Sequence, residues 1–220
     1  MVEPPPSPAA RLRALASDVA FWLLWLVFGW ILRLWLGVHS HGRPRLQGPC
    51  ILAPNHASFL DPVVLNACVP RRIVFLMTAM FFHVPWLHWF FRWTGTIPVQ
   101  EGHSNRDMMQ QALAALARGS AVAIFPEGGI SRDGRLLPGN HGVAALILRA
   151  RVPVIPVHIQ GTFAAMPRHA SWPRPAAVRV RFGEPIPPET WDHLAGLDRK
   201  TRLRLLTERV MAEIARLERS

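Results

Sequence analysis

Two residues whose side chains can together move a proton, His56 and Asp61, lie five positions apart, directly after the apolar run 50–54. We interpret this run as a strand, the next residues as a turn that exposes His56, and Asp61-Pro62 as a helix start, because proline is tolerated in a first helical turn. The turn allows the carboxylate of Asp61 to bind one ring nitrogen of His56, so that the other nitrogen can accept a proton. This pair is the base and the orienting group of a catalytic triad without its nucleophile. It suits an enzyme whose nucleophile is a hydroxyl group of the substrate.

Taken alone, the pair has a second interpretation. A histidine and an aspartate at this spacing occur by chance in many proteins, and an aspartate before a proline is an ordinary helix cap. The remainder of the chain has to decide between a catalytic pair and a capped helix.

The composition favours a single domain with an anionic partner. The chain has 220 residues, half of them hydrophobic, and a formal net charge of +11. A chain of this length can bury a sizeable core and is neither disordered nor a polytopic membrane protein by composition. The positive charge favours nucleic acid, anionic lipid headgroups, or an acidic substrate or carrier. The two cysteines, Cys50 and Cys68, lie in apolar surroundings, which indicates buried thiols without a disulfide framework.

The aromatic residues favour lipid among these partners. The chain has nine tryptophans and no tyrosine, and seven of the tryptophans fall before residue 94. Tryptophan is enriched at membrane–water interfaces. No zinc-ligand spacing, no RNA-binding aromatic motif and no compact basic run is present, so we expect membrane lipids as partners and no nucleic acid.

The N-terminal region divides into a Pro-rich disordered lead, residues 1–18, and a membrane-associated helix, residues 19–40. The charge-free run 19–32 would span only about 21 Å as a helix, which is short of the roughly 30 Å hydrocarbon core of a bilayer. Continuing past Arg33 would make the helix long enough, since arginine can extend its charged end to the interface. We expect a helix that lies in one leaflet. A single transmembrane span is the close alternative, and a helix packed on the protein's own core is the third.

Strands and helices alternate beyond residue 41, which predicts an α/β fold: a single domain, residues 41–220, with a mostly parallel central sheet flanked by helices. The predicted strands are 50–53, 73–77, 95–99, 121–125, 152–159 and 178–182, and the predicted helices are 61–68, 105–118, 141–149 and 198–219. The aromatic segment 79–93 is expected to face the membrane or an apolar chain. We expect no metal site, because His83 and His88 have no carboxylate nearby and His39 and His41 follow the N-terminal helix in a predicted loop.

Four stretches in fixed order together resemble the glycerolipid acyltransferase family, whose best-known members are 1-acylglycerol-3-phosphate acyltransferases. They are Asn55-His56 with Asp61; Gly95-Thr-Ile-Pro-Val99; Phe125-Pro-Glu-Gly128; and Val152-Pro-Val-Ile-Pro-Val157 with Gly161-Thr162. The resemblance covers roughly residues 45 to 185. The first and third stretches are specific as a pair, and the other two add weight by their order and spacing. Residues 41–220 are therefore expected to form an acyltransferase domain.

The resemblance implies transfer of a fatty acyl group from acyl-CoA or acyl-carrier protein to the hydroxyl of a lysophospholipid, without a cofactor. It implies that His56 is the general base and that Asp61 orients it. The positions implied to bind substrate are Asn55, Gly95, Ile97, Glu127, Gly128, Gly129 and Arg132. The chemistry agrees, because a thioester is activated and a hydroxyl needs only a base to attack it. The sequence also has no Gly-x-Ser-x-Gly nucleophile elbow.

Two arginines that the family uses near a phosphate are missing. Glu101 stands at the first of these positions and Ile130 at the second. Arg106 and Arg132 lie close enough along the chain to serve instead. The resemblance therefore leads us to expect lysophosphatidic acid as the acceptor, or another lysolipid such as lysophosphatidylethanolamine or lyso-ornithine lipid.

The leading hypothesis is a membrane-associated lysophospholipid acyltransferase on the cytoplasmic face of the bacterial inner membrane. A non-catalytic membrane-surface protein that binds lipid is the alternative from a different class. The intact His56 and Asp61 pair favours the enzyme.

Overall fold

A seven-stranded sheet forms the centre of the molecule in the computed structural model, which describes residues 8–42, 46–78, 96–99, 106–170 and 172–219. The strand order is β1-β7-β6-β2-β5-β3-β4. The strands are β1 (His39–His41), β2 (Cys50–Pro54), β3 (Ile73–Thr78), β4 (Ile97–Val99), β5 (Ala121–Ala123), β6 (Val154–Gln160) and β7 (Arg179–Phe182). Five strands, from β6 to β4, are parallel, while β7 pairs antiparallel with β6 and parallel with β1. The predicted α/β fold with a mostly parallel sheet is confirmed.

The middle strands are buried on both faces, which explains why they read as unbroken apolar runs. Every residue of β2 and β5 is buried, and so are the first six residues of β6. Parallel strands between two helical layers have this pattern, because neither face meets water.

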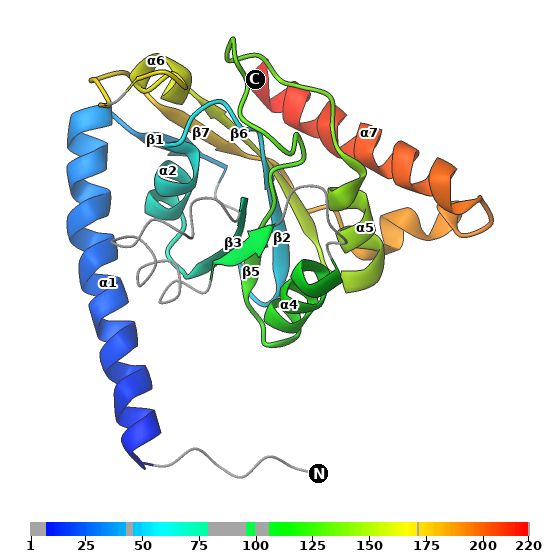
Figure 1. Cartoon of the computed structure of the whole chain (residues 1–220), viewed down its shortest axis with the longest axis horizontal. Coiled ribbons are helices and arrows are strands. Elements are labelled where there is room, and N and C mark those ends of the chain that lie inside the picture. Colours follow the sequence, from blue (N-terminus) through cyan, green and yellow to red (C-terminus); the bar gives the residue numbers. More distant parts are fainter. Residues whose placement is uncertain (1–7, 43–45, 79–95, 100–105, 171, 220) are drawn as a thin grey trace.

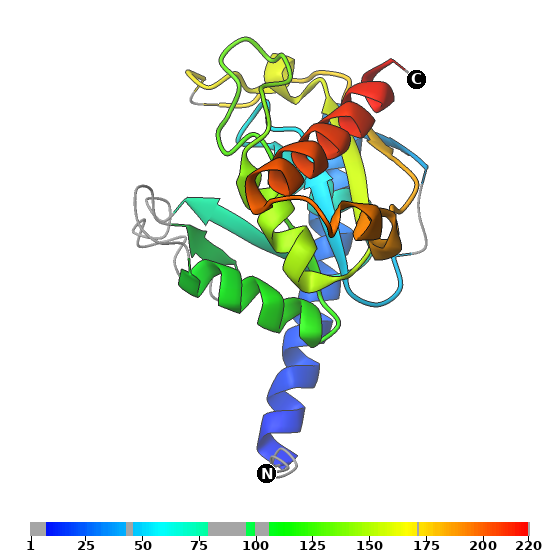
Figure 2. The same ribbon diagram turned by 90° about the vertical axis from the view of Figure 1, so that its right-hand side faces the viewer.

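The helices form one layer on each face of the sheet (Figure 1). On one face lie α1 (Pro8–Leu36) and α2 (Asp61–Cys68), and their buried side chains join those of Val180 and Phe182 in one core. On the other face lie α4 (Arg106–Ala117), α5 (His141–Ala150) and α7 (Arg199–Glu218), which form a second core with Val122 and Val154. Figure 2 shows α5 and α7 crossing in front of the sheet. The short helices α6 (Thr162–Ala165) and η2 (Pro188–Leu194) complete the chain.

The N-terminal helix differs from the predicted boundaries. It begins at Pro8, so residues 8–18 of the expected disordered lead are helical, and it ends at Leu36, so the expected helix 19–40 is four residues too long. Proline suits a first helical turn, and the residues after it are mostly alanine, leucine and arginine, which are strong helix formers.

The C-terminal part of α1 packs on the domain with one side only. Leu32 and Leu36 are buried against α2, while large apolar side chains on the other sides are exposed, Leu34 to 79%. The N-terminal part projects beyond the rest of the described chain (Figures 1 and 2). Among the described residues, no helix combines the length and the apolar character needed to cross a membrane.

The other predicted elements agree with the structure to within a few residues. One exception is 39–41, which forms edge strand β1 instead of a loop. The predicted aromatic segment 79–93 lies outside the described residues, as do Gly95 and Glu101.

Candidate active site

His56 and Asp61 meet at the carboxyl end of β2. The Nδ1 atom of His56 lies 3.0 Å from Oδ2 of Asp61. The same oxygen accepts hydrogen bonds from the backbone N–H groups of Ala57 at 2.7 Å and Ser58 at 2.8 Å. Oδ2 thus accepts in each of these contacts when Nδ1 of His56 carries the ring proton, while Oδ1 of Asp61 is buried without a hydrogen-bond partner in the described part of the chain. The Nε2 atom of this tautomer then carries a lone pair.

The local sequence builds this turn. The backbone N–H of Asp61 donates to the carbonyl of Ser58 at 3.2 Å, and the Ser58 hydroxyl accepts from the N–H of Leu60 at 3.1 Å. The same hydroxyl donates to the carbonyl of Met166 at 2.7 Å, which ties the turn to the segment after α6. Asp61 is the first residue of α2 and Pro62 follows it, as the sequence predicted. The N-cap position of α2 is Leu60, which makes no side-chain capping bond, so the alternative interpretation of Asp61 as a helix cap is wrong: its carboxylate accepts from N–H groups that precede the helix.

The ring of His56 is held between Asp61 and Phe125. The two rings are stacked, with centroids 3.9 Å apart and an angle of 22° between their planes. The His56 side chain is 15% exposed, whereas that of Asp61 is fully buried. Among the described residues, Nε2 has no hydrogen-bond partner. The ring therefore has one fixed orientation and one nitrogen open to a ligand.

Glu127 holds the backbone of the site. Its Oε1 accepts from the N–H of His56 at 2.6 Å, and its Oε2 accepts from the N–H of Leu137 at 2.8 Å. Burial raises the pKa of this carboxyl above its ordinary value, while the N–H groups of Leu137 and His56 act in the opposite direction. Both oxygens bind the protein itself, so the carboxylate joins the His56 turn to the Gly-rich turn that follows β5.

Asn55 has a comparable structural role. Its side-chain Nδ2 donates to the carbonyl of Ile159 at 3.0 Å, and its Oδ1 accepts from the N–H of the same residue at 2.6 Å. The side chain thus replaces a pair of sheet hydrogen bonds where β2 ends and β6 continues. The residue before His56 is fixed to the neighbouring strand in this way.

The Gly-rich turn 126–135 lies against the His56 turn. The N–H of Ser131 donates to the carbonyl of His56 at 2.9 Å. Arg132, which is exposed, follows Ser131 directly in the chain. Gly128 has a φ of 70°, and a Cβ there would lie 3.3 Å from Nδ2 of Asn140, so this position favours glycine on both counts. Gly129 is exposed at the tip of the turn.

The remaining predicted site residues are more distant from the pair. Ile97 is 4% exposed and belongs to the core on the α4 side of the sheet, where it supports β4. Arg106 is exposed at the start of α4. Among the contacts of the site that were not predicted are those of Phe125 with the His56 ring, Ile159 with Asn55, and Ser131 with the His56 carbonyl. Two of these use backbone atoms, which carry no sequence signal, but Phe125 lay within a recognised motif.

Among the residues that the structure describes, no three histidine, cysteine or acidic side chains are grouped closely enough to hold a metal ion. The site thus offers a fixed imidazole, a buried carboxyl group that orients it, and nearby backbone dipoles. The N–H groups of Ala57 and Ser58 are already bound by Asp61, so they cannot stabilise a developing oxyanion.

Comparison with known proteins identifies the relatives of this chain. A family model described as acyltransferase matches residues 37–160. A chloroplastic 1-acyl-sn-glycerol-3-phosphate acyltransferase of Brassica napus is 31% identical over 126 residues, covering 56% of this chain and 36% of the relative. A 1-acyl-sn-glycerol-3-phosphate acyltransferase of Cocos nucifera is 28% identical over 148 residues, covering 63% of this chain and 46% of the relative. The protein of that name from Saccharomyces cerevisiae is 28% identical over 202 residues, covering 84% and 65%. The chain thus spans about a third to a half of the length of the first two relatives.

A solved structure has the same fold. The crystal structure of the 1-acyl-sn-glycerophosphate acyltransferase from Thermotoga maritima superposes with a TM-score of 0.74, covering 94% of this chain and 82% of that chain. The sequence identity of 23% makes this a likeness of fold alone.

Proposed function

This chain belongs to the acyltransferase family, and from that premise we propose that it transfers a fatty acyl group from a thioester to the hydroxyl of a lysophospholipid. The observation that carries the proposal is the 3.0 Å contact between Nδ1 of His56 and Oδ2 of Asp61 at the carboxyl end of a parallel strand. Chemistry in α/β folds is usually placed at this end of the sheet.

In the proposed reaction, Nε2 of His56 takes the proton of the lysolipid hydroxyl as its oxygen attacks the thioester carbonyl. A new C–O bond forms and the C–S bond breaks. The proton held by His56 passes to the leaving thiolate, so the enzyme returns to its starting state. Asp61 stabilises the imidazolium that exists between the two proton transfers. No covalent acyl-enzyme is needed, because a thioester is already activated.

The Gly-rich turn is our proposed acceptor side of the site. Gly128, Gly129 and Arg132 lie on a loop that hydrogen-bonds to His56 through Ser131. Arg132 is exposed and can meet a phosphate with its forked donors. The relatives named above act on 1-acyl-sn-glycerol-3-phosphate by name, and we propose a lysophospholipid of this type first. A lysolipid without a phosphomonoester is the second candidate, because half-buried Ile130 occupies a position where the family carries arginine.

The membrane association is also a proposal. The exposed leucine, valine and tryptophan side chains of α1 suit insertion into one leaflet, where the acyl chains of substrate and product reside. We propose acyl-CoA or acyl-carrier protein as donor, and the cytoplasmic face of the bacterial inner membrane as the location.

The test of the proposed function is acyl transfer by the purified full chain. Radiolabelled acyl-CoA is supplied with a panel of lysolipids that differ in headgroup: lysophosphatidic acid, lysophosphatidylethanolamine and lyso-ornithine lipid. Labelled diacyl product with at least one of them supports the proposal and names the acceptor. Absence of product with every acceptor, from protein that binds vesicles and unfolds cooperatively, would favour a non-catalytic lipid-binding protein instead.

A further inference from the structure

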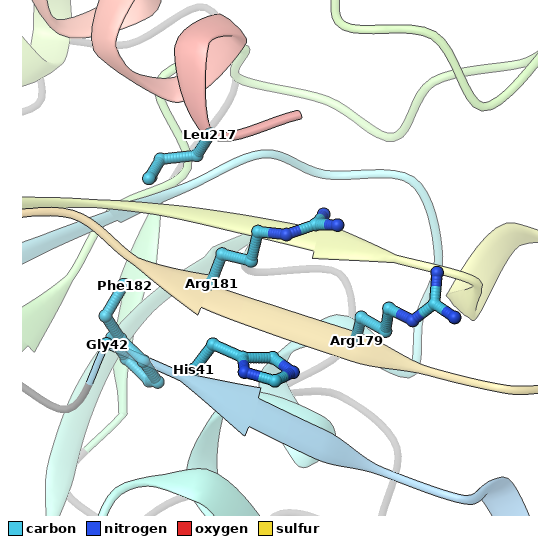
Figure 3. Close-up of a pocket in the computed structure, with 6 residues that line it drawn as sticks. All are labelled: His41, Gly42, Arg179, Arg181, Phe182 and Leu217. Atoms are coloured by element: carbon cyan, nitrogen blue, oxygen red, sulfur yellow. The ribbon is translucent and has the colours of Figure 1, made fainter. Parts of the chain in front are cut away.

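A second group of cations lies at the edge of the sheet, away from the His56 turn. A hollow of about 380 Å³ opens over β1 and β7 and is lined by His41, Gly42, Arg179, Arg181, Phe182 and Leu217. In Figure 3 the side chains of Arg179 and Arg181 rise from β7, beside His41 on β1 and below Leu217 of α7. We call this hollow the β1–β7 pocket.

The strand register explains why the cations gather on one face. Side chains of a strand alternate between the two faces of a sheet. On β7, Val180 and Phe182 point into the core on the α1 and α2 side, so Arg179 and Arg181 point to the other side. His39 pairs with Arg179 and His41 with Arg181, so both histidines share that face.

No ion pair holds these arginines within the described part of the chain, although the Glu218 carboxylate, next to Leu217, is near enough to raise the pKa of His158, the residue opposite Arg181. Neither Arg179 nor Arg181 has an ion pair there, and Arg181 donates only to Oε1 of Gln160, at 3.3 Å. Arginines on α7, by contrast, pair with glutamates on the same helix: Arg204 with Glu208 and Arg209 with Glu213. Two unpaired guanidinium groups in one hollow form a site for an anion with several oxygen atoms, because the guanidinium fork matches phosphate geometry.

The pocket is at a fixed distance from the His56 turn. Arg181 pairs with His158 of β6, and the adjacent Val157 pairs with Pro54 at the end of β2. Two strand spacings, about 10 Å, therefore separate Arg181 from the end of β2 in the plane of the sheet. The pocket also opens on the α7 face, whereas Asp61 belongs to α2 on the opposite face. In a lysophosphatidate, the phosphate is only a few bonds from the accepting hydroxyl. A phosphate bound in this pocket would therefore be too far from the His56 turn to belong to the acceptor.

We propose that the β1–β7 pocket binds a phosphate group that is remote from the reacting centre. Such a phosphate has two sources at a membrane-bound acyltransferase: the phosphopantetheine part of the acyl donor, or the headgroup of an anionic phospholipid of the bilayer. The chemistry of recognition is the same for both, and Arg179 and Arg181 supply it. The donor source rests on the proposed function, while the headgroup source does not.

The experiment compares two double variants of the full chain. Arg179→Gln/Arg181→Gln removes the two cations of the pocket. Arg118→Gln/Arg204→Gln removes two exposed arginines elsewhere, one after α4 and one on the outer side of α7, and is matched in net charge. Calorimetric titration with CoA, and with pantetheine as the ligand without phosphate, measures the donor source. Co-sedimentation with phosphatidylcholine vesicles, with and without 30 mol% phosphatidylglycerol, measures the headgroup source.

We expect the pocket variant to lose affinity at least tenfold for one of the two phosphate ligands, with pantetheine and pure phosphatidylcholine binding unchanged. A loss confined to CoA identifies the donor, and a loss confined to phosphatidylglycerol vesicles identifies the headgroup. Equal binding by the wild type and the pocket variant in both arms, or an equal loss in the charge-matched variant, would overturn the proposal. These measurements need no turnover. If the wild type transfers no acyl group but the pocket variant still loses affinity for a phosphate ligand, the proposed reaction is refuted and the phosphate site is supported.

Discussion

The carboxylate of Glu127 binds the backbone of His56, with Oε1 accepting the His56 N–H at 2.6 Å while Oε2 accepts the N–H of Leu137. A residue expected to meet the substrate thus has both oxygens engaged by the protein. This carboxylate connects the two turns that carry the site, one after β2 and one after β5. It fixes the position of the His56 backbone, while Asp61 determines how the ring is oriented.

Replacing Glu127 tests this positioning role. Glu127→Ala leaves two backbone N–H groups without their acceptor, and each unpaired buried donor costs about 1–3 kcal/mol. We expect a lower free energy of unfolding and a lower kcat, with little change in the KM for the lysolipid. Urea unfolding and steady-state kinetics measure these quantities, with exposed Glu184→Ala as the control. A raised KM with normal stability and kcat would show instead that Glu127 contacts the substrate.

Asn55 should act mainly through stability and geometry. Asn55→Ala removes both hydrogen bonds to the backbone of Ile159 and leaves that buried N–H and carbonyl unpaired. We expect the free energy of unfolding to fall by about 1–3 kcal/mol per unpaired group and acyl transfer to fall with it. Asn140→Ala is unsuitable as a control because Asn140, although exposed, caps α5. Gln110→Ala, at an exposed position, serves as the control. Unchanged stability in Asn55→Ala would contradict the role assigned to the side chain.

His158 makes the stability of the fold depend on pH. Burial lowers the pKa of this histidine below its ordinary value of 6.5; Arg181 acts in the same direction and Glu218 and Asp61 oppose it. Between the two pKa values the unfolded chain binds more protons than the folded chain. The contribution of neutral His158 to the free energy of unfolding is therefore fully present above pH 6.5 and is lost as the pH falls through the folded pKa. The free energy of unfolding changes by at most about 1.4 kcal/mol per pH unit for one proton.

The measurement for His158 is urea unfolding at a series of pH values from 7.5 to 5. His158→Leu, which has no titrating group, should show a shallower loss of unfolding free energy on acidification than the wild type. His169→Leu, at an exposed position, should keep the wild-type slope. Identical slopes for the wild type and His158→Leu would contradict the prediction.

The exposed face of α1 should hold the protein on lipid. Leu23, Val27, Trp30 and Leu34 recur at helical spacing and are all more than half exposed. Burying a large apolar side chain in lipid is worth about 1.5–3 kcal/mol. Replacing all four with glutamine should therefore weaken vesicle binding more than a hundredfold in a flotation assay. Leu197→Gln, an exposed leucine outside α1, should bind as the wild type does, and full binding by the α1 variant would refute the role of this face.

Much of the fold was predictable because the pattern of apolar residues follows burial. The strands β2 and β6 are buried on both faces and therefore appear as short apolar runs, and α7 has its leucine, valine and isoleucine residues three and four apart on the buried side. The predicted start of the N-terminal helix was wrong, because the proline-rich composition of the first residues suggested disorder. Pro8 is nevertheless compatible with a first helical turn.

The site was predictable only in part, for a physical reason. The pairing of His56 with Asp61 follows from a short turn before a helix, so sequence spacing is enough to predict it. The roles of Glu127 and Asn55 depend on N–H and carbonyl groups of distant segments, Leu137 and Ile159, and every residue has such groups. The arginines of β7 form a pocket only because β1 and β7 are neighbours in the sheet, an arrangement that appears with the tertiary structure.

The most direct test of the central claim is the rate of acyl transfer by His56→Ala at saturating acyl-CoA and lysolipid. Loss of a positioned general base lowers a rate by about 10²–10⁴-fold, and we predict a loss in kcat of this size, with the fold and vesicle binding retained. His193→Ala, an exposed histidine on η2, is the matched control and should keep the full rate. A His56→Ala protein with the kcat of the wild type would contradict the account, because the reaction would then proceed without the imidazole that the site holds in place.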